Sequence, residues 1–198
     1  MGGWFAKLIS RFANRAAVHE VRGFRVVVKN NRADIATEDV LERLGEALDL
    51  IARYQPWRLA HLRRDVTEFW VIRYACRGAF FPGERACMTE LTFLNRRDIT
   101  AAPVASSIVH EGIHARVHGM GVSPESRDLA REERLCRRAE LEFGQALPPD
   151  LGGPVVARAT ESLLLADEDV APAIDWPEAA RRVQAVDAAT KSKPQRNG

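Results

Sequence analysis

The chain has 198 residues, of which 46% are hydrophobic and 28% are charged, which is typical of one ordinary globular domain with an adequate core. Its net charge of +2 comes from 29 basic and 27 acidic residues without a basic patch, which argues against nucleic-acid binding. No stretch approaches the roughly eighteen apolar residues of a membrane span. The three cysteines form no C-x-x-C pair and no even disulfide set, so we expect a cytoplasmic protein.

The N-terminal segment has apolar residues at helical spacing. Trp4, Leu8 and Phe12 fall on one face of a helix, and Lys7 and Arg11 fall on the other. We therefore predict an amphipathic helix over residues 1–20 that docks on its own domain. Contact of residues 4–17 with a membrane surface is the alternative that we favour less.

The next segments predict a mixture of strands and helices. Residues 24–28 are rich in valine and predict a strand, and residues 37–51 predict an amphipathic helix that ends before Pro56. Residues 67–74 and 85–94 look like two further strands. Because Pro82-Gly83 forms a turn signal between them, we predict that they form a hairpin.

The second half of the chain is predicted to be helical. Residues 101–118 form one helix, ended by Gly119 and Gly121, and residues 123–146 form the next. A weaker helix is predicted over residues 155–165. We expect residues 21–180 to make up one domain, followed by a polar, disordered tail over residues 181–198.

The segment His110-Glu111-Gly112-Ile113-His114 has the spacing of a zinc site on a helix. Residues four apart lie one turn above each other, so both imidazoles can reach one ion at about 2.0–2.1 Å. Glu111 is offset around the helix and can touch a zinc-bound water without entering the coordination sphere. It would be the general base of a hydrolytic reaction. In the simpler alternative, both histidines only satisfy hydrogen bonds on a core-facing helix.

A catalytic zinc normally has three protein ligands and one water, so a third ligand is needed. His118 continues the same helix face but lies too far along the axis. In the next helix, Glu133 and Glu140 fall in an apolar stripe, where an ionised carboxylate needs a partner. We predict Glu133 as the third ligand and Glu140 as a partner of a histidine's outer N–H or of an arginine. Glu132 is the closest rival, and a solvated helix face with arginine ion pairs is the alternative.

The two histidines and the later Glu133 resemble the zincin metallopeptidases, and among them the gluzincins, over about residues 67–147. The resemblance implies a zincin-like α+β fold, in which a small antiparallel or mixed sheet packs on helices. It also implies Zn²⁺ as cofactor, a peptide or protein substrate, and an edge strand, residues 85–94, that binds extended substrate backbone. The chain departs from the gluzincin pattern at Arg137, where an acid is expected. It also resembles small bacterial proteins with an H-E-x-x-H helix and a later Glu-Arg-x-Cys helix, which implies no particular substrate.

We thus predict a zinc-dependent hydrolase of peptide or other amide bonds, with His110, His114 and Glu133 as ligands. The donor that stabilises the developing oxyanion is left open among His118, Tyr74 and Arg116. Two other functions stay open. A site like that of the peptide deformylases would use Cys87 as third ligand, and a non-catalytic interaction module would keep the zinc for stability.

Overall fold

The structure is a computed structural model, which describes residues 16–122, 128–171 and 175–191. The elements of the first half are β1 (Ala17–Val21), β2 (Phe24–Lys29), α2 (Thr37–Tyr54), α3 (Pro56–Asp65), β3 (Glu68–Ile72), β4 (Gly78–Phe81), β5 (Ala86–Glu90) and α4 (Leu91–Leu94). The second half consists of α5 (Ala102–Gly119), α6 (Leu129–Ala146), α7 (Pro149–Leu163), α8 (Asp167–Val170) and α9 (Trp176–Lys191).

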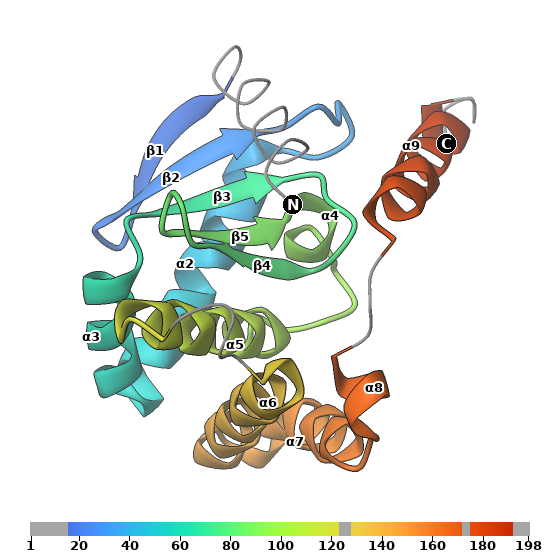
Figure 1. The fold of residues 1–198 in the computed structure, drawn as a ribbon. Coiled ribbons are helices and arrows are strands. Elements are labelled where there is room, and N and C mark those ends of the chain that lie inside the picture. Colours follow the sequence, from blue (N-terminus) through green and yellow to red (C-terminus); the bar gives the residue numbers. More distant parts are fainter. Residues whose placement is uncertain (1–15, 123–127, 172–174, 192–198) are drawn as a thin grey trace.

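The strands form one mixed sheet in the order β1-β2-β3-β5-β4. The three central strands are parallel, whereas β1 and β4 run antiparallel to their neighbours at the two edges. A two-residue turn joins β1 to β2 with positive φ at both Arg22 (52°) and Gly23 (76°), the turn geometry that suits the twist of a hairpin. The expected α+β class with a mixed sheet packed on helices is therefore confirmed (Figure 1).

The predicted hairpin of residues 67–74 and 85–94 is wrong. Strands β3 and β5 are parallel neighbours, with Phe69 opposite Cys87, and the hairpin partner of β5 is the four-residue strand β4. The turn at Pro82 exists, but it joins β4 to β5. Strand β5 also ends early, because the Glu90 carboxylate accepts a hydrogen bond from the backbone N–H of Phe93 (2.8 Å) and so caps α4.

Both faces of the sheet are covered near its centre. Phe69 and Val71 of β3 face the main core, which extends through α2, α5, α6 and α7. The alternate residues Trp70 and Ile72 belong to a smaller cluster on the other face. Trp176 at the start of α9 packs against that cluster. This alternation places the two sides of β3 in two separate cores.

Helix α5 lies between the sheet and the α6–α7 pair (Figure 1). It confirms the helix predicted over residues 101–118 and is buried on several sides, which explains why its small and apolar residues extend around most of the helix. Helix α6 begins at Leu129, where the Asp128 side chain accepts a hydrogen bond from the Arg131 backbone N–H (3.0 Å). The start predicted at residue 123 lies outside the described residues.

Helices α6 and α7 approach closely at Gly152. A Cβ at this position would lie 2.1 Å from the carbonyl oxygen of Gly144, whereas a Cβ at Gly153 would meet open space. We expect Gly152→Ala to lower the free energy of unfolding by about 1–3 kcal/mol or more, because the helices must separate. Gly153→Ala should be neutral or slightly stabilising. Urea denaturation of both variants measures this difference, and equal stabilities would contradict the close contact.

The two ends of the chain differ from expectation. The helix predicted over residues 1–20 falls mostly outside the described residues, but its last part, residues 17–20, belongs to β1. Pairing with β2 outweighs the helical pattern there. The predicted disordered tail is wrong for residues 181–191, which continue α9; Asp187 of this helix pairs with Arg32 and Arg73 at 3.1 and 3.0 Å. Residues 192–198 lie outside the described residues.

None of the helices in the described part of the chain is at once long enough and apolar enough to cross a membrane.

Candidate metal centre

The side chains of the three predicted ligands converge between α5 and α6. The Nε2 atoms of His110 and His114 lie 3.2 Å apart. Glu133 Oε2 lies 3.3 Å from the Nε2 of His110, and Glu133 Oε1 lies 3.2 Å from the Nε2 of His114. Ligands at about 2.0–2.1 Å from a tetrahedral zinc ion are separated from one another by about 3.3 Å. The structure thus brings the three predicted ligand residues together, with a different Glu133 oxygen nearest to each ring.

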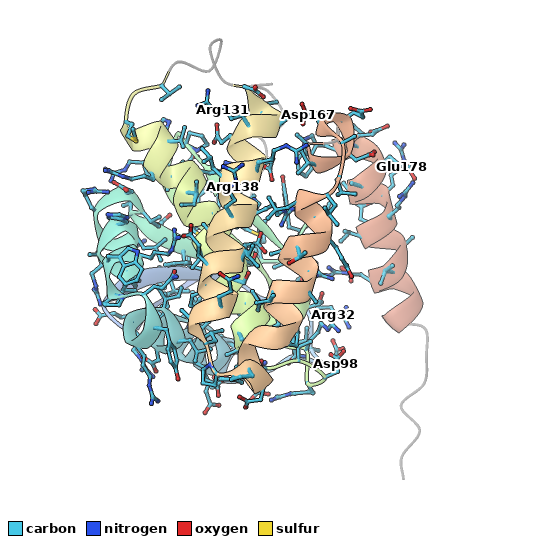
Figure 2. All side chains as sticks on the ribbon, turned by 90° about the horizontal axis from the view of Figure 1, so that it is seen from below. Arg32, Asp98, Arg131, Arg138, Asp167 and Glu178 are labelled. Carbon is cyan, nitrogen blue, oxygen red and sulfur yellow. The ribbon has the colours of Figure 1, made fainter. Side chains whose placement is uncertain are left out.

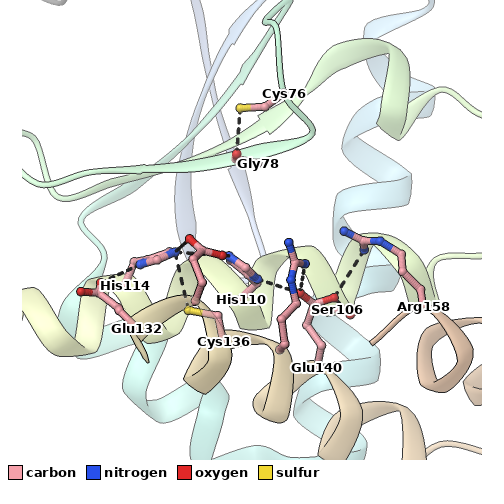
Figure 3. Close-up of polar contacts among 11 residues, drawn as sticks. Cys76, Gly78, Ser106, His110, His114, Glu132, Cys136, Glu140 and Arg158 are labelled. Atoms are coloured by element: carbon pink, nitrogen blue, oxygen red, sulfur yellow. Dashed lines mark hydrogen bonds and ion pairs between the residues drawn. The ribbon is translucent and has the colours of Figure 1, made fainter. Parts of the chain in front are cut away.

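Carboxylates from α6 hold the outer nitrogens of both rings. His110 Nδ1 lies 2.7 Å from Glu140 Oε1, and His114 Nδ1 lies 2.7 Å from Glu132 Oε1 (Figure 3). Because a carboxylate can only accept, each Nδ1 carries the hydrogen and each Nε2 is directed to the point of convergence. The role predicted for Glu140 is confirmed. Glu132, the rival ligand, instead orients His114.

Glu140 connects the site to two arginines and a serine. Its side chain is 1% exposed and accepts hydrogen bonds from Ser106 Oγ (3.0 Å) and Arg137 Nη1 (2.6 Å). Arg158 Nη1 lies 3.4 Å away. These partners and His110 compensate a charge that would otherwise be costly to bury. The alternative of a solvated helix face is therefore wrong for Glu140 and for Glu132, which is also buried.

The electrostatics of the cluster favour positively charged imidazoles beside a negatively charged Glu133 carboxylate. Burial opposes charge on His110, but its hydrogen bonds to Glu133 and Glu140 raise the pKa of this imidazole to about 10. In the same way, burial is outweighed at His114 by hydrogen bonds to Cys136, Glu132 and Glu133, which raise its pKa well above the ordinary value. The two rings hold the pKa of Glu133 far below its usual range, against the effect of burial. A divalent cation would replace these protons on binding.

Glu111 lies beside the ligands and is almost fully buried, with 7% of its surface exposed. Burial raises the pKa of its carboxyl group, and the negative charges of Glu133 and Glu140 act in the same direction, while the two histidines oppose it. A buried carboxylate whose pKa is raised toward neutrality is suited to accept and return a proton.

Strand β4 approaches this carboxylate through a glycine. A Cβ on Gly78 would lie 2.9 Å from Glu111 Oε1 and 2.7 Å from Ser107 Oγ. Any larger residue at this position must displace one of them. Gly78 therefore allows the edge of the sheet to lie directly against the Glu111 carboxylate.

Substitution of Gly78 tests this packing. We expect Gly78→Ala to lower the free energy of unfolding by about 1–3 kcal/mol, because the added methyl group displaces Glu111 or Ser107. Thermal unfolding measures the loss. The matched control is Gly83→Ala in the turn after β4, where a Cβ would meet nothing within 4 Å. Similar losses in both variants would show that Gly78 is not specially constrained.

The site opens into a cavity of about 520 Å³ between β4, α5 and α6. The edge strand beside it is β4, so the substrate edge predicted at residues 85–94 is wrong: β5 is covered on that side by β4. The lining residues are Cys76, Arg77, Gly78, Ala79, Phe80, Pro82, Ser107, His110, Glu111, His114, Leu129, Glu133, Arg137, Glu140, Arg158, Val170, Ala171 and Trp176. None of His118, Tyr74 and Arg116, the suggested oxyanion donors, is among them.

Cys136 is a ligand candidate that the sequence analysis missed. Its Sγ lies 3.5 Å from His114 Nε2, and the ligand atoms of His110, His114 and Cys136 lie within 4.8 Å of one another. The signal was available, since Cys136 follows Glu133 by three residues on the same helix face. Cys87 does not belong to this group. It is fully buried in the main core, and burial raises the pKa of its thiol, which disfavours the thiolate that a metal needs.

Comparisons of the chain with family models, with curated proteins and with solved structures give no match. The resemblance to zincins therefore stays a prediction from the sequence.

Proposed function

We propose that the protein is a zinc-dependent hydrolase of peptide or other amide bonds, with His110, His114 and Glu133 as metal ligands. The observation that carries this proposal is the convergence of two Nε2 atoms and one carboxylate at 3.2–3.3 Å from one another. Both imidazoles are also oriented through Nδ1 by buried carboxylates, an arrangement typical of metal-binding histidines.

The donor set favours zinc over harder ions. Two imidazole nitrogens and one carboxylate oxygen match a catalytic zinc site, whereas calcium and magnesium prefer oxygen ligands alone. When bound, zinc would supply Lewis acidity, which makes water more acidic and a carbonyl group more electrophilic.

Glu111 would move the proton in this reaction. It lies next to His110 in the chain and lines the same cavity as the three ligands. Its raised pKa suits a group that takes a proton from the attacking water and later gives it to the leaving amine. Gly78 of β4 lies directly against its carboxylate.

The test begins with the full chain, purified, stripped of metal and reloaded with zinc. We expect one equivalent of zinc to bind and zinc-dependent cleavage to appear in a mixture of peptides analysed by mass spectrometry. A zinc-loaded protein that cleaves no peptide and no other amide would overturn the proposed reaction. Failure to bind zinc would overturn the site itself.

A second candidate function rests on the position of Cys136, 3.5 Å from His114 Nε2. If Cys136 completes the coordination, four protein ligands close the site, as in structural zinc sites, and the protein would be a zinc-stabilised interaction module. The two candidates therefore differ in whether the thiolate is a permanent ligand.

Cobalt substitution distinguishes the two candidates. For the hydrolase, we expect the cobalt-loaded protein to lack the intense charge-transfer absorption of a cobalt–thiolate bond, and Cys136→Ser to keep both metal and activity. The closed structural site predicts the opposite, with that absorption present and the metal lost in Cys136→Ser. Cys87→Ser is the matched control, since Cys87 is buried elsewhere in the core.

A further inference from the structure

Three arginines line the cavity, Arg77, Arg137 and Arg158, which we call the arginine group. They come from three different segments: Arg77 immediately precedes β4, Arg137 lies on α6 and Arg158 lies on α7. The Arg137 and Arg158 guanidinium groups both reach Glu140, at 2.6 and 3.4 Å (Figure 3 for Arg158). Three cations from distant parts of the chain thus gather in one cavity.

Few of the described carboxylates contact the arginine group directly. Among the described residues, Glu140 is the one carboxylate that Arg137 and Arg158 contact. The same carboxylate also accepts a hydrogen bond from His110. Within the same described part of the chain, Arg77 has no ion pair, and its guanidinium lies over the Phe93 ring at 5.3 Å. The Nε of Arg137 is buried and has no hydrogen-bond partner there. A buried donor without a partner is costly and points to a missing acceptor.

The electrostatics of Arg158 also indicate that positive charges lie close together in the cavity. Burial lowers the pKa of its guanidinium, and the positive charges of Arg137 and Arg77 lower it further, although Glu140 acts in the opposite direction. The two neighbours are therefore close enough to repel it. An added anion would relieve that repulsion.

We infer that the arginine group binds a carboxylate of the substrate, close to the bond that is cleaved. This inference rests on the proposed hydrolase function and adds a substrate class to it. A single carboxylate links Arg137 to the proposed ligand His110, because Glu140 Oε1 accepts from both Arg137 Nη1 (2.6 Å) and His110 Nδ1 (2.7 Å). Because consecutive Cα atoms are about 3.8 Å apart, the carboxylate would belong to a residue at or next to the cleaved bond.

The remaining wall of the cavity suits the rest of such a substrate. Phe80, Val170 and Trp176 add apolar surface to the lining. Guanidinium groups bind carboxylates through paired N–H donors, which gives direction as well as charge. The shared chemistry is a carboxylate, and its source can be the C-terminus of a peptide or the side chain of aspartate or glutamate.

Binding of small probes to the full chain tests the inference without requiring turnover. The probes are N-acetylphenylalanine, its amide, and the α-amide of N-acetylglutamate, titrated by calorimetry into zinc-loaded and zinc-stripped protein. We expect at least one carboxylate probe to bind about tenfold or more tightly than the neutral amide in both forms. The first probe represents a C-terminus and the third an acidic side chain. The order of their affinities therefore identifies the source of the carboxylate.

Two variants and a control locate the binding site. Arg158→Gln should reduce the preference for the carboxylate about tenfold, and it should fold because 42% of that side chain is exposed. Arg77→Gln provides the second variant. The matched control is Arg138→Gln, which changes an exposed arginine on the outward side of α6 and should have no effect (Figure 2).

Three results would overturn the inference: equal binding of acids and amide, a preference that disappears when zinc is removed, or a preference unchanged in both arginine variants. The second result would mean that the carboxylate binds the metal instead. Failure here is distinct from failure of the proposed function. Zinc-dependent cleavage without any carboxylate preference would keep the hydrolase and reject the arginine group as its specificity site.

Discussion

Replacing Glu111 with glutamine should leave zinc bound and lower turnover by about 100- to 10,000-fold, the usual contribution of a positioned general base. Glutamine has nearly the same shape, so it fits the same space beside Gly78. It cannot accept the proton of the attacking water. The measurement is the rate constant for peptide cleavage at saturating zinc, together with the metal content of each preparation.

The control for this variant is Glu161→Gln, which removes the same charge from an exposed position on α7. It should change neither rate nor metal content. A Glu111→Gln protein that keeps the full rate would show that another group accepts the proton. Loss of zinc in this variant would instead mean that Glu111 is a ligand.

The second large effect is expected at the neighbouring pair Glu132 and Glu133. Glu133→Gln removes a ligand charge and should weaken zinc binding by more than about 100-fold. Glu132→Gln removes only the carboxylate that accepts from His114 Nδ1, and such changes typically cost about 10- to 100-fold. Competition with a chromophoric zinc chelator gives both dissociation constants.

These two substitutions control for each other, since they make the same chemical change at adjacent positions of α6. The order of the two effects is the decisive observation. If Glu132→Gln weakens zinc binding more than Glu133→Gln, the ligand is Glu132 and α6 is rotated relative to the present structure. Equal, small effects would point to Cys136 as the third ligand.

The sequence predicted the helices of the site well because their signals are local. The helix carrying His110 and His114 was recognised from its spacing and from the glycines that end it. The partner role of Glu140 followed from a simple physical argument, that a carboxylate in an apolar stripe must be compensated. The same argument led to Glu133, whose carboxylate now lies within 3.3 Å of both rings.

The pairing of strands was not predictable in the same way. Strand β4 has only four residues, and its partner depends on contacts that no local pattern encodes. Two strand signals separated by a Pro-Gly turn looked like a hairpin, although β3 and β5 are parallel neighbours. The contact of Glu132 with His114 and the gathering of the arginine group were missed for a related reason. They depend on the rotation of α6 and on how α7 and β4 pack, which spacing alone does not fix.

The division of the site between two helices has a consequence for the stability of the whole protein. Helix α5 lies beside the sheet, whereas the carboxylates that contact the two imidazoles all belong to α6, which packs with α7 on the outer side (Figure 1). A cation bound by residues of both helices would therefore act as a cross-link between an inner and an outer layer. Its binding free energy adds to the docking of that layer, so chelation should loosen the outer helical pair while the strands stay assembled.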